Sequence, residues 1–354
     1  MSLATLLGTE LPLLQAPMAG VQGSRLAIAV NQAGGLGALP CAMLSAEAIR
    51  AEVAAIRAQG AHPFNLNFFC HAPPSPDPVR EEAWRQKLAG DYARFGLDPS
   101  TMPAGPGRRP FDADMLTLVR ELRPPVISFH FGLPEESLLA PLREWGCRIL
   151  SSATTVDEAR WLEAHGVDAV IAQGLEAGGH RGLFLSEDLT TQIGTFALLP
   201  QVVAAVRCPV IATGGIADAA GVAAAMALGA AGVQIGTAFL LCPEADTSAL
   251  HRAALLRPEA AHTALTNVFT GRPARGIVNH AMRTLGPMAD DAPAFPLATA
   301  AMAPLRQAAE ARGSDDYSPL WAGQNIAGAR PAPAAQRIWD LARGFGPQEP
   351  PCLV

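Results

Sequence analysis

The stretch "PVIATGGIADAAGVAAAMALGAAGVQIGTAF", Pro209 to Phe239, decides the fold. The apolar run at 209–215 and the run that begins at 232 and continues to 241 are short, and each contains glycine where a strand would give way to a loop, which is typical of buried parallel strands. Between them lies an alanine-rich segment with Asp218 placed to cap the first turn of a helix. Strand, helix and strand in this order predict one β/α/β unit of a parallel sheet.

The same alternation extends over most of the chain. We expect eight strands, at 13–19, 35–40, 64–69, 126–131, 148–153, 168–174, 209–215 and 232–241. Helices are expected at 24–32, 45–60, 113–123, 135–146, 156–166, 196–207 and 218–229. Eight strands alternating with helices in about 240 residues are typical of an α/β fold, the (β/α)8 TIM barrel. No G-x-G-x-x-G motif is present to favour an open dinucleotide-binding sheet.

Three parts of the sequence differ in composition. Residues 1–242 are predicted to form the barrel. Within them, residues 71–110 are rich in proline and too long for an ordinary connection, so we expect a surface excursion near the active face. Residues 243–354 are more polar and rich in proline and glycine, and we expect an appended, mostly helical segment that packs over the barrel.

The composition suits a compact protein that acts on small molecules. Of the 354 residues, 49% are hydrophobic and 16% are charged, so much of the chain can be buried. The formal net charge is −6 and no lysine or arginine block is present, which argues against nucleic acid or an anionic membrane as the partner. The six cysteines lack zinc-site spacing, so we expect reduced thiols and no metal site.

We expect neither a targeting segment nor a membrane span. The N-terminus lacks a basic start followed by a sustained apolar stretch, which predicts a cytoplasmic protein without a signal peptide. Residues 219–242 carry no charge, but Gly221, Gly229, Gly232 and Gly236 interrupt them. A helix followed by a buried strand explains this run better than a membrane span.

In such a barrel the active site forms at the carboxyl ends of the strands. Candidate ligand-binding residues lie at or just beyond the ends of five of the expected strands: Met18, Ala19, Asn67, Gln173, Gly178, Gly179, Gly214, Gly215, Gln234, Ile235, Gly236 and Thr237. The last two strands are the most informative, because their glycines leave backbone N–H groups unobstructed before a helix start. They predict a phosphate cradle, and the alternative is that these glycines only make tight turns.

Two amide side chains suggest what carries the phosphate. Asn67 and Gln173 can both donate and accept hydrogen bonds, which suits the edge of a flavin ring. Met18, Ala19 and Gly20 offer a low backbone rim for a flat ring. A sugar phosphate substrate remains the alternative.

Seven motifs in order resemble the nitronate monooxygenases, formerly called 2-nitropropane dioxygenases, of class I type. They are LLQAPMAG, AGGLGALP, NLNFF, ISFHFG, DAVIAQGLEAGGHRG, PVIATGGIADAAGVAAAMALGAAGVQIGTAFL and PLWAGQ, between Leu13 and Gln324. The resemblance implies non-covalently bound FMN and the oxidation of alkyl nitronates, such as propionate 3-nitronate, by O2 to a carbonyl compound and nitrite. It also implies FMN contacts by Asn67, Gln173, Gly178, Gly215 and the run Gln234 to Thr237.

The resemblance places His130 on the family's catalytic histidine. From a strand end it could face the flavin and accept the α-proton of a neutral nitroalkane, or stabilise a bound nitronate. Neutral imidazole is needed for the first role, and imidazolium helps the second. Phe129 and Phe131 are expected to point away, into the packing between barrel and helices. The alternative is a buried structural histidine bonded to a carbonyl.

Other reactions on the same barrel stay open. His180 lies in a Gly-Gly-His motif that resembles flavin-dependent enoyl reductases as well, and we expect it to support the site without direct catalysis. A flavin-binding protein without turnover is a further alternative. So is an NAD(P)H:quinone reductase, because flavin enzymes can bind nicotinamide in an open cleft. The LWAGQ motif implies that the loop near Tyr317, Trp321 and Gln324 folds over the flavin. The remaining histidines are expected to be solvated: His62, His71, His165, His251, His262 and His280. The oligomeric state is undecided.

Overall fold

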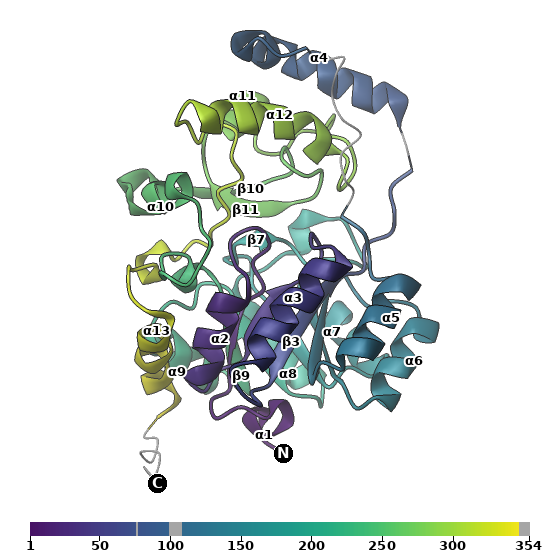
Figure 1. The fold of residues 1–354 in the computed structure, drawn as a ribbon, viewed down its shortest axis with the longest axis vertical. Coiled ribbons are helices and arrows are strands. Elements are labelled where there is room, and N and C mark those ends of the chain that lie inside the picture. Colours follow the sequence, from purple (N-terminus) through teal and green to yellow (C-terminus); the bar gives the residue numbers. More distant parts are fainter. Residues whose placement is uncertain (76, 99–107, 347–354) are drawn as a thin grey trace.

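The computed structural model describes residues 1–75, 77–98 and 108–346. Eight parallel strands form one sheet in the order β1-β9-β8-β6-β5-β4-β3-β2, with helices around it (Figure 1). A parallel bridge between Leu14 and Leu36 joins the two ends of the sheet, so the predicted TIM barrel is confirmed. The strands are β1 (Leu13–Gln15), β2 (Gly37–Pro40), β3 (Phe64–Phe69), β4 (Val126–His130), β5 (Arg148–Ala153), β6 (Ala169–Gln173), β8 (Val210–Thr213) and β9 (Gly232–Ile235).

The helices expected between the strands are all present. They are α2 (Ser24–Gln32), α3 (Ala46–Arg57), α5 (Ala113–Leu122), α6 (Glu136–Glu144), α7 (Val156–Ala164), α8 (Thr195–Ala205) and α9 (Ala219–Ala227). Several begin at a side-chain cap: Ser45, Asp112, Thr155 and Asp218 each accept a hydrogen bond from the backbone N–H three residues ahead. Such caps satisfy N–H groups that the first turn leaves without partners.

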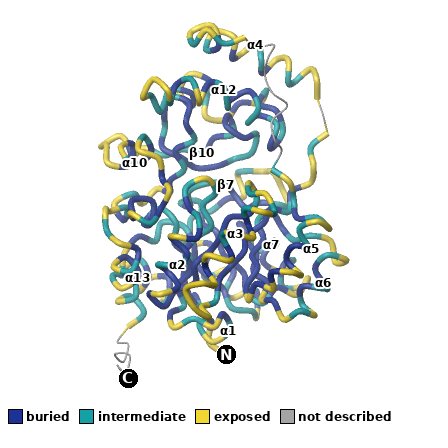
Figure 2. The backbone as a smooth tube through the Cα atoms, in the orientation of Figure 1, coloured by how far each residue is buried: buried dark blue, intermediate teal, exposed yellow. Residues whose placement is uncertain are grey.

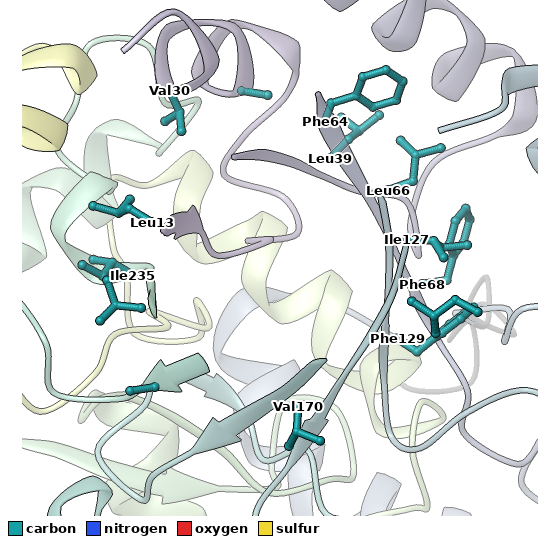
Figure 3. Packing of buried hydrophobic residues seen from close by; sticks show 14 of the residues in the cluster. Leu13, Val30, Leu39, Phe64, Leu66, Phe68, Ile127, Phe129, Val170 and Ile235 are labelled. Carbon is teal, nitrogen blue, oxygen red and sulfur yellow. The ribbon is translucent and has the colours of Figure 1, made fainter. Parts of the chain in front are cut away.

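The period of two along each strand decides which side chains reach the barrel interior. In β4, Ile127 and Phe129 point outward into the core shared with the helices (Figure 3). Val126 belongs to a separate cluster inside the barrel. Because side chains alternate, Ser128 and His130 face inward with Val126. The interior therefore becomes polar toward the carboxyl end of β4.

A short helix closes the amino-terminal end of the barrel. Leu3 and Leu7 of α1 (Leu3–Leu7) pack with inward-facing strand residues such as Leu14 and Ile211 in that interior cluster. The cavity of the barrel is thereby filled at one end and left for polar side chains at the other.

No helix or strand was predicted from the sequence within the surface excursion expected at 71–110. This stretch contains the 18-residue helix α4 (Pro78–Phe95), which is capped by Asp77. Trp84, Leu88 and Tyr92 of α4 are buried against α12 in a second hydrophobic core. The helix was missed because seven of its 18 residues are charged and only one narrow face is buried, as the exposed upper edge in Figure 2 shows.

The remaining elements lie mainly above the barrel. β7 (Gly179–His180), β10 (Thr263–Thr266) and β11 (Ala274–Ile277) form an antiparallel sheet in the order β10-β11-β7. The helices are α10 (Ala249–Leu256), α11 (His280–Leu285), α12 (Ala298–Ala311) and α13 (Ala334–Ala342), with 3₁₀ turns η2 (Leu189–Thr191), η3 (Thr237–Phe239), η4 (Pro258–Ala261), η5 (Ile326–Gly328) and η6 (Arg343–Phe345). Because β7 belongs to the barrel's sixth loop, this small sheet ties the upper layer to the barrel.

The helix α13 returns to the side of the barrel. Ala334, Ile338 and Leu341 are part of the main core, and α13 packs against α2 and α9. It thus occupies the place of the eighth helix in the ring (Figure 1). The division of the chain at residue 242 stays a prediction, but the barrel draws one helix from beyond it.

The uncharged run at 219–242 is divided between α9, β9 and η3. In the described ranges, no helix is long and apolar enough to cross a membrane. The same ranges contain no group of three or more histidine, cysteine or acidic side chains that could hold a metal ion.

Candidate active site

One cavity opens at the carboxyl ends of the barrel strands, with about 1440 Å³ of empty space including its mouth. Every site residue predicted from the sequence lines it: Met18, Ala19, Asn67, His130, Gln173, Gly178, Gly179, Gly214, Gly215, Gln234, Ile235, Gly236 and Thr237. The side chain of Ile235 packs in the core behind the sheet. The structure brings these residues together, and their roles stay predictions.

The loops after β8 and β9 have the form of a phosphate cradle. Gly214 and Gly215 adopt φ values of 115° and 73°, which side chains other than glycine rarely tolerate. No hydrogen bond within the described part of the chain uses the N–H groups of Gly215, Gly236 or Thr237. The helix α9 begins nearby with Asp218 as its cap. The free N–H groups can therefore bind an anion at the cavity wall.

A loop of the upper layer covers the cavity. Trp321 and Gly323 line it, and the N–H of Gln324 donates to the carbonyl of Glu176 at 2.9 Å. A Cβ on Gly178 would lie 2.5 Å from the nitrogen of Gly323, so the two loops meet closely. Tyr317 lies elsewhere: it is buried beside α4, and its hydroxyl donates to Asp91 at 2.5 Å.

The two predicted amide contacts have different partners. The Nδ2 group of Asn67 donates to the Ser128 hydroxyl at 2.9 Å, which leaves its Oδ1 to accept a hydrogen bond. The amide of Gln173 is already occupied, because it donates to the carbonyl of His180 and accepts from the N–H of Gly182. Gln173 therefore holds the loop that carries His180.

An unsatisfied polar atom shows that the cavity fits a polar ligand. The Oε1 atom of Gln234 is buried and has no hydrogen-bond partner among the residues that the structure describes, and Gln234 lines the cavity between the two glycine loops. Buried polar atoms are normally paired in proteins. With the glycine cradle and the acceptor of Asn67, this atom suits a group that carries both a phosphate and a polar ring edge, as FMN does.

Both nitrogens of His130 are engaged. Nδ1 lies 2.6 Å from the hydroxyl oxygen of Ser152, and Nε2 lies 3.1 Å from the carbonyl oxygen of His180. A carbonyl only accepts, so Nε2 carries the proton and Nδ1 accepts from Ser152. Burial lowers the pKa of His130 to about 3, so the imidazole of the protein alone is neutral at ordinary pH.

The expectation for Phe131 is wrong. Its φ is 70°, so β4 ends at His130 and the Phe131 ring belongs to a cluster separate from the core between barrel and helices. There it packs with Phe69 and Phe295, and its centroid lies 4.5 Å from that of the His130 ring. Phe129 points into the helix-facing core as expected.

His180 and several residues that the sequence did not single out also meet this cavity. His180 lines it and its Nε2 lies 2.9 Å from the Thr270 hydroxyl; burial holds the pKa of His180 well below its usual value. His251 lines the cavity as well, and His71 is buried beside Phe295, so neither is solvated as expected. Arg108 and Ser152 are further lining residues. No local pattern marked Arg108 or His251, because the segment before α5 and the helix α10 reach the site through tertiary packing. Ser152 was missed although it lies near the end of β5, a predicted strand.

Comparison with known proteins identifies the family. A family model described as nitronate monooxygenase matches residues 1–344. The chain belongs to the nitronate monooxygenase family. The nitronate monooxygenase of Pseudomonas aeruginosa is 44% identical, over 95% of this chain and 96% of its own. That of Paraburkholderia phytofirmans is 43% identical, over 97% of this chain and 94% of its own. The resemblance of the motifs is confirmed, and the chain is an oxidoreductase of this family.

Solved structures agree with this assignment. A nitroalkane oxidase from Streptomyces ansochromogenes is 41% identical and superposes with a TM-score of 0.88, with 98% of each chain covered. FabK from Thermotoga maritima is 26% identical with a TM-score of 0.70, over 98% of this chain and 96% of its own. Both solved structures share the fold over almost the whole chain. The nitroalkane oxidase is more similar to this chain than FabK is, by sequence identity and by TM-score.

Proposed function

We propose that this protein is an FMN-dependent nitronate monooxygenase. It would oxidise alkyl nitronates such as propionate 3-nitronate with O2, releasing a carbonyl compound and nitrite. The observation that carries the proposal is the single cavity that joins the glycine cradle after β8 and β9 to His130 at the end of β4. An oxidoreductase of this family needs a cofactor site and a group able to manage the substrate's proton and charge, and both kinds of residue line that cavity.

The cofactor's phosphate would bind at the N–H groups of Gly215, Gly236 and Thr237. Oδ1 of Asn67 and Oε1 of Gln234 would accept hydrogen bonds from polar groups of the ring. FMN fits better than FAD, because the cradle offers one phosphate position and the chain has no dinucleotide motif. When bound, FMN supplies the electron transfer between nitronate and O2.

His130 would act through Nδ1, the nitrogen that does not carry a proton. With a neutral nitroalkane, the α-proton would pass to Nδ1 as negative charge grows on the nitro group. The imidazolium so formed lies beside the new anion, and this pairing offsets the burial that lowers the pKa of His130 in the protein alone. With a preformed nitronate no proton has to be removed, and His130 would only hold the anion. The covering loop with Trp321 and Gly323 would exclude water.

A reductase activity is the second candidate. It is favoured by the structural similarity to FabK and by His180, which lines the cavity beside His130. Such an enzyme would take electrons from NAD(P)H and pass them to an enoyl thioester or a quinone. Its substrates differ from nitronates, so turnover separates the two candidates.

Steady-state turnover tests the proposal. Purified protein in air should consume O2 and release nitrite with ethyl nitronate or propionate 3-nitronate, and should oxidise NADH slowly whether or not quinone is added. Rapid NADH oxidation with quinone, together with no nitrite from either nitronate, would support the reductase instead.

A further inference from the structure

A guanidinium group lines the cavity on the side away from the phosphate cradle. Arg108 precedes α5 and contributes to the wall that also contains Phe69, His130 and His180. Phe69 and His130 belong to the neighbouring strands β3 and β4. In the eight-stranded order this pair is shifted by four positions from the pair β8 and β9, which carries the two glycine loops. That separation is half the circumference of the closed barrel. Arg108 is therefore not part of the cradle.

The charge of Arg108 has no counterion in the described part of the chain. None of the ion pairs found there involves Arg108. Its Nη1 atom donates a hydrogen bond to the hydroxyl oxygen of Thr299, at 3.0 Å. Burial lowers the pKa of Arg108 to about 10, and the nearby Arg306 adds to the effect. Arg108 stays protonated at neutral pH. Such a partly buried cation is costly unless an anion joins it.

Aromatic packing fixes where this cation sits. The Cζ atom of Arg108 lies 5.5 Å from the ring centroid of Phe295. The Phe295 ring in turn lies 5.3 Å from that of His180 and 6.2 Å from that of Phe69. Arg108 thus belongs to the aromatic wall of the substrate side. Its N–H groups other than the one bonded to Thr299 have no hydrogen-bond partner among the described residues, so they could donate to a ligand in the cavity.

We propose that Arg108 binds a second anionic group of the substrate, so that the enzyme selects nitronates that carry a carboxylate at the end away from the nitronate carbon. This inference rests on the proposed function and adds the residue that determines specificity. A carboxylate fits because the planar guanidinium fork presents parallel donors to two oxygens.

The carboxylate of such a substrate is a better ligand for Arg108 than its nitronate group. The Phe295 ring beside Arg108 lies 5.3 Å from the His180 ring, whereas no ring contact within the described residues joins Phe295 to His130. Arg108 therefore lies toward His180 and away from the group expected to hold the nitronate. A substrate with one charge at each end could contact both.

The test compares two nitronates that differ only in the distal group. Propionate 3-nitronate carries a carboxylate where propyl-1-nitronate carries a methyl group. In Arg108→Gln, kcat/KM for propionate 3-nitronate should fall by about 10- to 100-fold, the usual effect of losing a charged hydrogen bond. The loss should appear in KM, because the contact is equal in ground and transition states. The loss with propyl-1-nitronate should stay within about threefold.

Two further measurements make the result specific. Arg306→Gln removes a neighbouring positive charge that is paired with Glu310 and does not line the cavity, so it should not discriminate between the substrates. Binding can be separated from turnover in a His130→Asn background, in which nitroalkanes are hardly oxidised, and followed by flavin fluorescence. In that background, adding Arg108→Gln should weaken the binding of 3-nitropropionate and leave that of 1-nitropropane unchanged.

Equal losses on both nitronates, or full activity of Arg108→Gln on propionate 3-nitronate, would overturn the inference. Failure of the proposed function has a different signature, since the wild-type protein would then release nitrite from neither nitronate. Arg108→Lys keeps the charge without the fork and should recover part of the lost affinity, which excludes misfolding as the cause.

Discussion

The hydrogen bonds of His130 limit what this residue can do. Its Nε2 donates to the carbonyl of His180, so only Nδ1 can receive a proton, and the Ser152 hydroxyl lies 2.6 Å from it. A proton from the substrate must displace that hydroxyl or pass through it. The lowered pKa ensures that Nδ1 is unprotonated when a neutral substrate arrives.

Replacing His130 by asparagine should separate the two kinds of substrate. We expect His130→Asn to lose about 10²- to 10⁴-fold in turnover of a neutral nitroalkane, the usual contribution of a general base. A preformed nitronate has already lost its α-proton, so its oxidation should fall far less, and the flavin content should not change. Nitroalkane and nitronate assays on the same preparation make the comparison. Equal losses on both substrates would remove His130 from the base role and favour His180.

The Ser152→Ala variant is a matched companion, because it keeps the imidazole and removes only its hydroxyl partner. Since that hydroxyl occupies Nδ1, its loss should alter nitroalkane turnover and leave nitronate turnover nearly unchanged. Ser152→Thr should restore the wild-type ratio. No effect of Ser152→Ala on the ratio would show that the proton takes another path.

At the scale of elements, the sequence predicts the structure best where strands and helices alternate regularly along the barrel. Strand ends and glycine loops were predictable because alternation and left-handed glycines are local properties, and these placed Asn67 and Gly215 at the cavity. Arg108 and His251 were not predictable, because the segment before α5 and the helix α10 reach the site only through tertiary packing. Phe131 was misjudged because its positive φ ends a run that otherwise continues as a strand.

The two glycine loops give an element-scale prediction. In Gly215→Val the branched side chain would face a φ of 73° and a Cβ position 3.4 Å from the Cβ of Glu176. The loop should shift and its N–H groups lose their alignment, so FMN affinity should fall at least about tenfold. Added FMN should then raise the Tm of the wild type more than that of the variant. Gly90→Ala, on the exposed part of α4, is the control substitution. Wild-type FMN affinity in Gly215→Val would place the phosphate elsewhere.

At the scale of the whole molecule, buried histidines should make the fold sensitive to acid. The pKa values of His71 and His251 are lowered to about 4 and that of His130 to about 3, mainly by burial. The unfolded chain binds these protons near pH 6.5, so it holds more protons than the native state below that pH. The stabilisation is complete above about pH 6.5 and is lost as pH falls toward 4.

Thermal unfolding between pH 7.5 and 5 measures this effect above the range in which most carboxylates titrate. We expect Tm to fall by several degrees, about 2–4 °C for each kcal/mol in domains of 150–250 residues. The fall should be smaller in His251→Gln and unchanged in His62→Gln, because His62 is exposed. A Tm that does not change over this range would contradict the burial of neutral histidines.

The central claim, that one cavity holds FMN and receives nitronates, is tested most directly by anaerobic mixing. The purified protein should be yellow, and heat should release FMN. Without O2, propionate 3-nitronate should bleach the flavin absorbance rapidly, and admitting air should restore it with release of nitrite. NADH at the same concentration should leave the spectrum nearly unchanged. A flavin that NADH bleaches and nitronate does not, or a protein that binds no FMN, would contradict the account.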